Sequence, residues 1–172
     1  MKNMNCISLI GMPAVGKSTI GVLLAKALGY AFLDTDLLIQ VTTQRTLPQI
    51  IAEDGFLELR KIEADVIGSV DCARTVIATG GSAVHAPQSM THLRSLGRIV
   101  YLCADVNILQ TRIGNLESRG VAAAADATLE SIIAERLPMY ERFSDLTIDA
   151  GQHPAIVLAN LLQALGVNAD IN

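Results

Sequence analysis

One short stretch near the N-terminus constrains the fold of this chain more than any other feature. Residues 11–18 have the sequence GMPAVGKS, which fits the pattern G-x-x-x-x-G-K-[ST]. The apolar run at 6–10 predicts a strand before it, and apolar residues at helical spacing after it predict a helix that ends at Gly29. A strand, a glycine-rich turn and a helix in this order are typical of a phosphate-binding loop. We therefore expect a nucleotide polyphosphate as ligand.

The chemistry of such a loop follows from its backbone and two side chains. Glycines let successive N–H groups point inward at phosphate oxygens, and the N-terminus of the helix adds partial positive charge. Lys17 is expected to reach the β- and γ-phosphates, and the Ser18 hydroxyl to ligate Mg²⁺. The loop predicts what is held, and it leaves open what is done with the phosphate.

The rest of the chain alternates short apolar runs with helical segments. Strands are predicted at 31–33, 75–78, 98–102 and 146–148. Helices are predicted at 47–70, after Asp105, at 129–143 with a kink or break at Pro138, and from Pro154 onward. This order predicts an α/β fold: a single domain over 1–172, built as a three-layer α/β/α sandwich around a five-stranded parallel sheet.

Polar residues follow three of the predicted strands and should line one crevice at their carboxyl ends. Asp34 and Asp36 point to the same side of an extended segment. One is suited to hold Mg²⁺ through water, and the other to accept a proton from an attacking hydroxyl, although Asp-Thr-Asp is also ordinary turn and cap chemistry. Gly80 and Gly81 suit close approach of backbone to a ligand, or an ordinary turn.

Three further positions are open to two interpretations each. Arg60 and Glu63 share one helix face, either as a surface ion pair or as a clamp in which Arg60 grips an anion and Glu63 fixes its guanidinium. Residues 112–126 contain few large apolar groups and two arginines, which indicates a mobile lid over the phosphates or a surface loop. Arg136 is either a surface charge or a second anion clamp.

Composition and missing motifs exclude several classes of protein. A net charge of −4 and the lack of a basic run argue against nucleic acid as partner. No apolar run reaches the roughly 18 residues of a membrane span. The cysteines lack C-x-x-C spacing, which argues against a metal site or disulfide framework and favours the cytoplasm. Neither N-K-x-D nor L-S-G-G-Q occurs, so a small phosphotransferase is favoured over a GTPase or an ABC-type motor, and a non-catalytic nucleotide-binding regulator stays open.

Taken together, these motifs resemble the shikimate kinase family of small phosphate-loop kinases, which have a nucleoside-monophosphate-kinase-like fold. The resemblance runs from Ile7 to about Ile148. It rests on GMPAVGKSTIG, FLDTD, GFLELRKIE, ATGGSAV, Arg119 in the lid and ERLPMYERFSDLTI. The order of Asp-x-Asp, Arg60 with Glu63, Thr-Gly-Gly and Arg-x-Pro-x-Tyr is more specific than the phosphate loop alone.

The resemblance implies an enzyme that uses ATP and Mg²⁺ to phosphorylate the 3-hydroxyl of shikimate, in aromatic amino-acid biosynthesis. It implies a cytoplasmic monomer whose small-molecule substrate carries a carboxylate. The catalytic residues implied are Lys17, Asp36 and Arg119. Those implied for ATP are Gly11, Ala14, Val15, Gly16, Lys17, Ser18, Thr19, Arg112 near adenine and Arg119; those for the metal are Ser18 and Asp34; those for the acceptor are Asp36, Arg60, Gly80, Gly81 and Arg136.

The chain departs from the family pattern in its acceptor half and its lid. Ser82 stands where a third glycine is usual, Leu59 where a phenylalanine is usual, and Gly120 with Val121 where Pro-Leu is usual. The nucleotide half of the pattern is intact. A kinase for another small hydroxylated acid, such as gluconate or homoserine, is therefore the alternative within enzymes.

Overall fold

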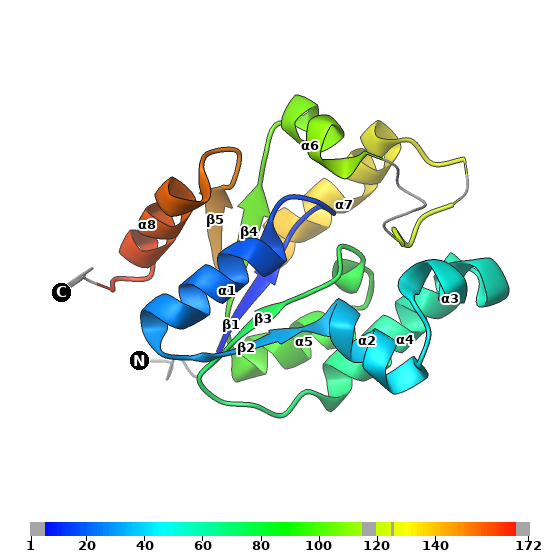
Figure 1. The fold of residues 1–172 in the computed structure, drawn as a ribbon, viewed down its shortest axis with the longest axis horizontal. Helices are drawn as coiled ribbons and strands as arrows, with labels where there is room; N and C mark the ends of the chain where they lie inside the picture. The colour runs from blue at the N-terminus through cyan, green and yellow to red at the C-terminus, as the bar shows by residue number, and fades with distance from the viewer. Residues whose placement is uncertain (1–5, 115–119, 125, 168–172) are drawn as a thin grey trace.

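A parallel sheet forms the centre of the computed structural model, which describes residues 6–114, 120–124 and 126–167 (Figure 1). Its strands are β1 (Cys6–Ile10), β2 (Ala31–Asp34), β3 (Thr75–Ala78), β4 (Gly97–Cys103) and β5 (Leu146–Asp149). They lie in the order β2-β3-β1-β4-β5, and every neighbouring pair is parallel. The predicted five-stranded parallel sheet is confirmed.

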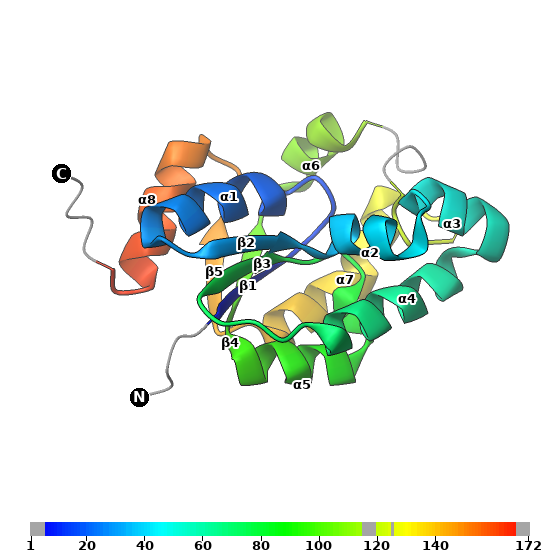
Figure 2. The ribbon, with the colours of Figure 1, turned by 60° about the horizontal axis from the view of Figure 1, so that its bottom comes forward.

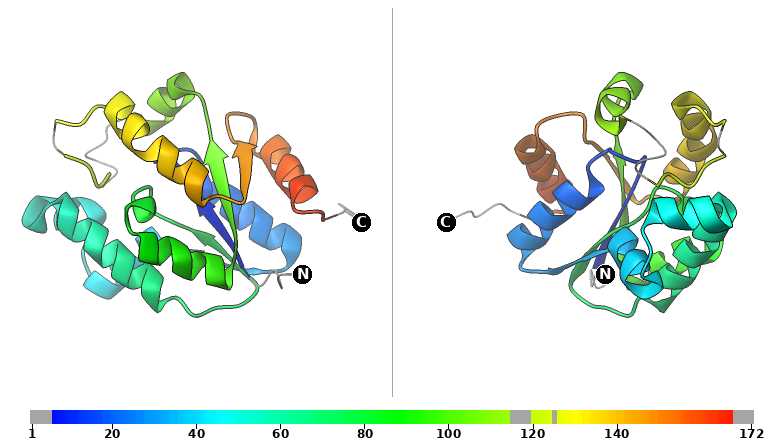
Figure 3. Two further views of the ribbon diagram at one scale, coloured as in Figure 1. Left: turned by 180° about the vertical axis from the view of Figure 1, so that it is seen from behind. Right: turned by 45° about the vertical axis from the view of Figure 1, so that its right-hand side comes forward.

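Helices cover both faces of this sheet, which makes the three predicted layers (Figures 2 and 3). One face carries α1 (Lys17–Leu28) and α8 (Pro154–Ala164), and the other carries α4 (Phe56–Ser69), α5 (Pro87–Leu96) and α7 (Leu129–Phe143). The shorter elements are α2 (Thr35–Thr43), α3 (Leu47–Asp54), α6 (Val106–Ile113) and the 3₁₀ turn η1 (Ala83–His85). Among the described helices, none combines the length and apolar character that crossing a membrane requires.

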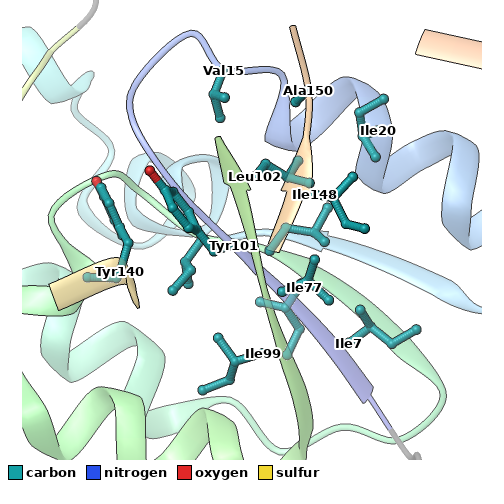
Figure 4. Close-up of a cluster of buried hydrophobic side chains, with 14 of the residues drawn as sticks. Ile7, Val15, Ile20, Ile77, Ile99, Tyr101, Leu102, Tyr140, Ile148 and Ala150 are labelled. Atoms are coloured by element: carbon teal, nitrogen blue, oxygen red, sulfur yellow. The ribbon is translucent and has the colours of Figure 1, made fainter. Parts of the chain in front are cut away.

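The pattern of burial explains why the strands take this order. Every residue of β1 and β3 is buried, as expected for central strands covered on both faces, whereas the edge strands β2 and β5 are partly exposed. Ile77 of β3 and Ile99 of β4 stand in one register and belong, with Tyr101, to the buried core, whereas Ile7 of β1 is one residue out of that register and packs on the opposite face of the sheet (Figure 4). The Tyr101 ring stacks on Tyr140 of α7 with centroids 5.1 Å apart.

Three local expectations differ from the structure. The zone at 47–70 is two helices, because Gly55 takes φ 86° between them. Helix α2, which was not predicted, begins directly after Asp34. Helix α7 continues through Pro138 without a break. Pro138 and Ala134, whose carbonyl loses its helical partner, are both exposed, so water can satisfy that carbonyl.

The cysteines are less scattered in space than in sequence. The Sγ atoms of Cys6 and Cys72 lie 3.6 Å apart, and Cys6 donates to the Cys72 carbonyl at 3.3 Å. Both thiols are free. Among the described residues, no cluster of His, Cys, Asp or Glu has the form of a metal-binding group.

Tyr140 connects the core to the turn that follows β3. Its ring is buried against Tyr101, and its hydroxyl donates to the Gly81 carbonyl at 2.6 Å. The motif Arg-x-Pro-x-Tyr therefore has a structural role at its last position. It attaches helix α7 to the Gly80–Gly81 turn.

We expect Tyr140→Phe to lower the free energy of unfolding by about 1–3 kcal/mol, because the partly buried Gly81 carbonyl loses the hydrogen bond from the tyrosine hydroxyl. Denaturant unfolding followed by circular dichroism measures the change. Tyr101→Phe, which keeps the stacked pair, is the control. An unfolding free energy for Tyr140→Phe equal to that of the wild type would show that this hydrogen bond does not stabilise the turn.

Candidate active site

The phosphate-binding loop connects β1 to α1 and takes a backbone shape that few residues tolerate. Gly11, Ala14 and Gly16 all have positive φ, at 144°, 62° and 111°. A Cβ at Gly11 would overlap the carbonyl oxygen of Leu102 in β4. No side chain caps the N-terminus of α1, so its first N–H groups remain available to an anion.

Lys17 begins α1 and points back across the loop. Its Nζ is buried and donates to the carbonyls of Gly11 at 2.8 Å and Met12 at 2.9 Å. Burial lowers the pKa of this ammonium group to about 8, although the nearby carboxylates of Asp36 and Glu63 oppose the shift. The lysine is thus held beside the cavity that the loop borders.

Ser18 and Asp34 are brought together as the sequence predicts. The Ser18 hydroxyl donates to Asp34 Oδ2 at 2.6 Å. The other oxygen, Oδ1, accepts from the backbone N–H groups of Asp36 at 3.0 Å and Leu37 at 3.4 Å, which makes Asp34 the N-cap of α2. The cap interpretation of the Asp-Thr-Asp stretch is therefore confirmed for Asp34, whose other oxygen contacts the loop serine, and the metal and proton-accepting roles of the two aspartates stay predictions.

Asp36 lines a cavity of about 350 Å³ that also borders the phosphate loop. Burial raises the pKa of the Asp36 carboxyl to about 6; the Lys17 charge opposes this shift and the Asp34 charge adds to it. Between the two aspartates, the buried Thr35 hydroxyl accepts from the Gly80 N–H at 3.1 Å. Sequence reasoning missed Thr35, although its place between two functional residues was a signal.

Gly80 and Gly81 lack side chains because other groups occupy that space. A Cβ at Gly80 would overlap Glu63 Oε1 and lie 2.8 Å from Asp36 Oδ1. A Cβ at Gly81 would lie 2.9 Å from Pro13 Cδ and 3.1 Å from Arg136 Nη1. The two glycines thus let acidic and basic side chains approach the two sides of one turn, and the approach of a ligand to this backbone stays a prediction.

Arg60 and Arg136 converge on one backbone oxygen. Arg136 donates from Nη2 to the Ala122 carbonyl at 2.7 Å, and Arg60 donates to the same carbonyl from Nη2 at 3.1 Å and Nε at 3.3 Å. Arg136 is 0% exposed and its Nε has no hydrogen-bond partner in the described part of the chain. Arg136 is therefore not a surface charge, and the two guanidinium groups form a ready site for an oxygen acceptor.

Glu63 does not fix the guanidinium of Arg60, so that part of the clamp interpretation is wrong. Arg60 lies 3.6 Å from Glu135 Oε1 instead. Glu63 is 3% exposed and accepts a hydrogen bond from the Ser82 hydroxyl at Oε2, while its Oε1 has no partner among the described residues. Burial, together with the charge of Asp36, raises the pKa of the Glu63 carboxyl to about 7.

Arg112 lies on the other side of the phosphate loop. It donates from Nη1 to the carbonyls of Val15 at 3.2 Å and Ala150 at 3.0 Å, and from Nη2 to Gly151 at 3.4 Å. A second cavity of about 360 Å³ adjoins it, lined also by Val15, Thr19 and Pro154. This cavity lies next to the loop, and Asp36 is not among its lining residues.

The predicted lid is described only in part. Arg119 lies outside the described residues. Gly120, Val121 and Ala122 line the main cavity, and Ala122 is 4% exposed in a cluster with Leu59 and Leu47. All three positions at which the chain departs from the family pattern, Ser82, Leu59 and the Gly120–Val121 pair, therefore border one cavity.

The chain is similar in sequence to proteins of one known family. The family described as shikimate kinase matches residues 13–166. A curated relative, shikimate kinase 2 of Yersinia enterocolitica, is 34% identical over 92% of this chain and 94% of its own length, and that of Yersinia pestis is equally similar.

Solved structures agree. A shikimate kinase of Acinetobacter baumannii in complex with shikimate matches with a TM-score of 0.86 at 28% identity, covering 99% of this chain and 97% of its own. The shikimate kinase of Aquifex aeolicus matches at 0.81 and 26% identity, over 97% and 99%. The chain belongs to the shikimate kinase family and is an ATP-dependent small-molecule kinase.

Proposed function

We propose that this enzyme transfers the γ-phosphoryl group of ATP to the 3-hydroxyl of shikimate. The observation that carries this proposal is the convergence of Arg60 and Arg136 on the Ala122 carbonyl oxygen, at 2.7 to 3.3 Å, where Ala122 and Arg136 line the same cavity as Lys17 and Asp36. Two arginines whose donors meet at one point suit a carboxylate, which accepts several N–H groups at once. The acceptor is thus a hydroxylated acid whose carboxylate replaces the Ala122 carbonyl.

The nucleotide half of the reaction uses the phosphate loop. Backbone N–H groups from Ala14 to Thr19 hold the phosphates, and Lys17 exchanges its two carbonyl acceptors for phosphate oxygens. Arg112 borders the base. Gly11 lets the loop pass beneath the end of β4. Arg119 is assigned to the phosphates from the family resemblance alone.

Ser18 and Asp34 fit a magnesium site. Their oxygens are 2.6 Å apart at the loop, and Mg²⁺ binds through few protein oxygens, completing its shell with phosphates and water. A bound Mg²⁺ supplies charge neutralisation between the β- and γ-phosphates. Ser18 and Asp34 would hold that ion, since the Asp34 oxygen that faces Ser18 is not the one that caps α2.

Asp36 acts on the acceptor hydroxyl. Its carboxylate accepts the hydroxyl hydrogen bond and then the proton, while the hydroxyl oxygen forms a bond to the γ-phosphorus and the bond to the bridging oxygen of ADP breaks. Because the pKa of Asp36 is raised to about 6, it is ionised at neutral pH and still basic enough to take a proton. We place this single kinase domain in the cytoplasm, acting as a monomer.

Phosphoryl transfer to shikimate tests the function directly. We expect the purified protein with Mg-ATP to release ADP and form singly phosphorylated shikimate. It should turn over gluconate and homoserine far more slowly, because both are open-chain acids whereas shikimate is a ring. Coupled ADP release and mass spectrometry of the product measure this. Turnover of another acid in place of shikimate would overturn the proposed substrate, and ATP binding without turnover of any acid would favour a regulator.

Asp36→Asn should lower the turnover number by about 10²- to 10⁴-fold, because the amide cannot accept the proton. ATP affinity, measured by calorimetry, should stay close to that of the wild type. In the wild type, turnover should fall as the pH drops through about 6, where Asp36 becomes protonated. Asp71→Asn, at an exposed carboxylate, is the matched control.

The same variant should be more stable than the wild type at pH 8. The pKa of Asp36 is higher in the folded protein than its ordinary value, so its ionisation opposes folding above pH 6 and the amide removes that penalty. The gain in Tm should shrink at pH 5, where Asp36 is mostly protonated. Near-normal turnover in Asp36→Asn would rule out the role assigned to this residue.

A further inference from the structure

The turn formed by Gly80, Gly81 and Ser82 separates a buried acid from a buried base. Glu63 is 3% exposed and its Oε1 occupies the space where a Gly80 side chain would begin. Arg136 is 0% exposed, and its Nη1 lies 3.1 Å from the space that a Gly81 side chain would enter. Even so, in the described part of the chain no ion pair joins Glu63 to Arg136 or Arg60.

A hydroxyl group accounts for this separation. Ser82 is 6% exposed, and its Oγ donates to Glu63 Oε2. The backbone around it is held by two turn hydrogen bonds, from Ala83 N–H to the Gly80 carbonyl at 3.4 Å and from His85 N–H to the Ser82 carbonyl at 3.0 Å. The serine hydroxyl is therefore fixed in place, and Glu63 is fixed by it.

Without that hydroxyl, Glu63 would lose the hydrogen bond that competes with its attraction to the arginines, since its other oxygen has no partner among the described residues. The charge of Glu63 already acts on Arg60, three residues before it in α4, and that of Arg136 acts on Glu63. A carboxylate that reached either guanidinium would form the stronger, forked type of hydrogen bond. It would then occupy the donors that the carboxylate of the acceptor needs.

We propose that Ser82 is a positioning residue whose hydroxyl holds Glu63 away from Arg60 and Arg136, so that both guanidinium groups stay available to the acceptor carboxylate. This inference rests on the function proposed for the same site. The family pattern usually has a glycine at this position, which carries no hydroxyl. Ser82 thus gives this chain its own means of keeping its acid and its carboxylate clamp apart.

The test compares Ser82→Ala with Ser82→Thr in the coupled kinase assay. We expect Ser82→Ala to raise the KM for shikimate about tenfold, equivalent to about 1.4 kcal/mol, with kcat and the KM for ATP unchanged. Ser82→Thr keeps a hydroxyl and should restore the wild-type KM. Ser89→Ala, at a buried serine of α5 whose hydroxyl has no partner in the described residues, should leave all three constants unchanged.

A double variant separates positioning from a merely structural role. Because Gln carries no charge to compete for the arginines, Ser82→Ala should add little to the KM of Glu63→Gln. Ser82→Gly, which has the usual family residue, should behave like Ser82→Ala and covers the case in which the alanine variant folds poorly.

The outcomes distinguish this inference from the proposed function. If the wild type turns over shikimate, four results would each overturn the role of Ser82 alone. They are an unchanged KM for shikimate in Ser82→Ala, a lowered KM for shikimate in Ser82→Gly, an equal rise in the KM for shikimate and the KM for ATP, and full additivity with Glu63→Gln. A wild-type protein that phosphorylates a different carboxylic acid overturns the proposed substrate, and the same KM comparison with that acid then decides the role of Ser82. A wild-type protein that phosphorylates no carboxylic acid overturns both.

Discussion

The site depends on a buried cation that has a neutral partner. Arg136 lies fully inside the protein, and the group that it meets at 2.7 Å is the Ala122 carbonyl, which Arg60 shares. A backbone carbonyl carries only partial negative charge, so it satisfies the geometry of the two guanidinium groups without matching their charge. Arg60 also lies 3.6 Å from Glu135 Oε1, whereas Arg136 has no ion-pair partner in the part of the chain that the structure describes. A carboxylate at the point of the Ala122 carbonyl would supply both the geometry and the charge. The two arginines are therefore better suited to bind the carboxylate of a ligand than the Ala122 carbonyl.

The charges around the Gly80–Gly81 turn are balanced as a set rather than in pairs. Lys17 and Arg136 are buried with Glu63 and close to Asp36, yet each is bonded to a neutral group: loop carbonyls, the Ala122 carbonyl or the Ser82 hydroxyl. Burial raises the pKa of Asp36 to about 6 and of Glu63 to about 7, and lowers that of Lys17 to about 8. Such shifts cost stability and are typical of sites that await charged substrates.

Local patterns in the sequence predicted the parts of this structure that depend on neighbouring residues. The phosphate loop, the five strands and the Ser18–Asp34 contact follow from spacing along the chain and from the rule that parallel strands end at one edge. Helix α2 was missed because Asp34 ends a strand and caps a helix at once. The Ser82–Glu63 bond and the meeting of Arg60 with Arg136 at Ala122 join separate elements, and no local pattern encodes them. The spacing of Arg60 and Glu63 even favoured the wrong partner.

The most direct test of the account is a comparison of shikimate with its carboxamide as acceptors, measured as kcat/KM at saturating Mg-ATP. The carboxamide lacks the negative charge that Arg60 and Arg136 would meet, and it has an N–H donor in place of one acceptor oxygen. The account predicts that the carboxamide loses about 10²-fold or more in kcat/KM, because the buried guanidinium group of Arg136 and the partly buried one of Arg60 then lose the charge of the ligand, and hydrogen bonds to charged groups contribute about 1.5–3 kcal/mol each. Equal kcat/KM for the two acceptors would contradict it.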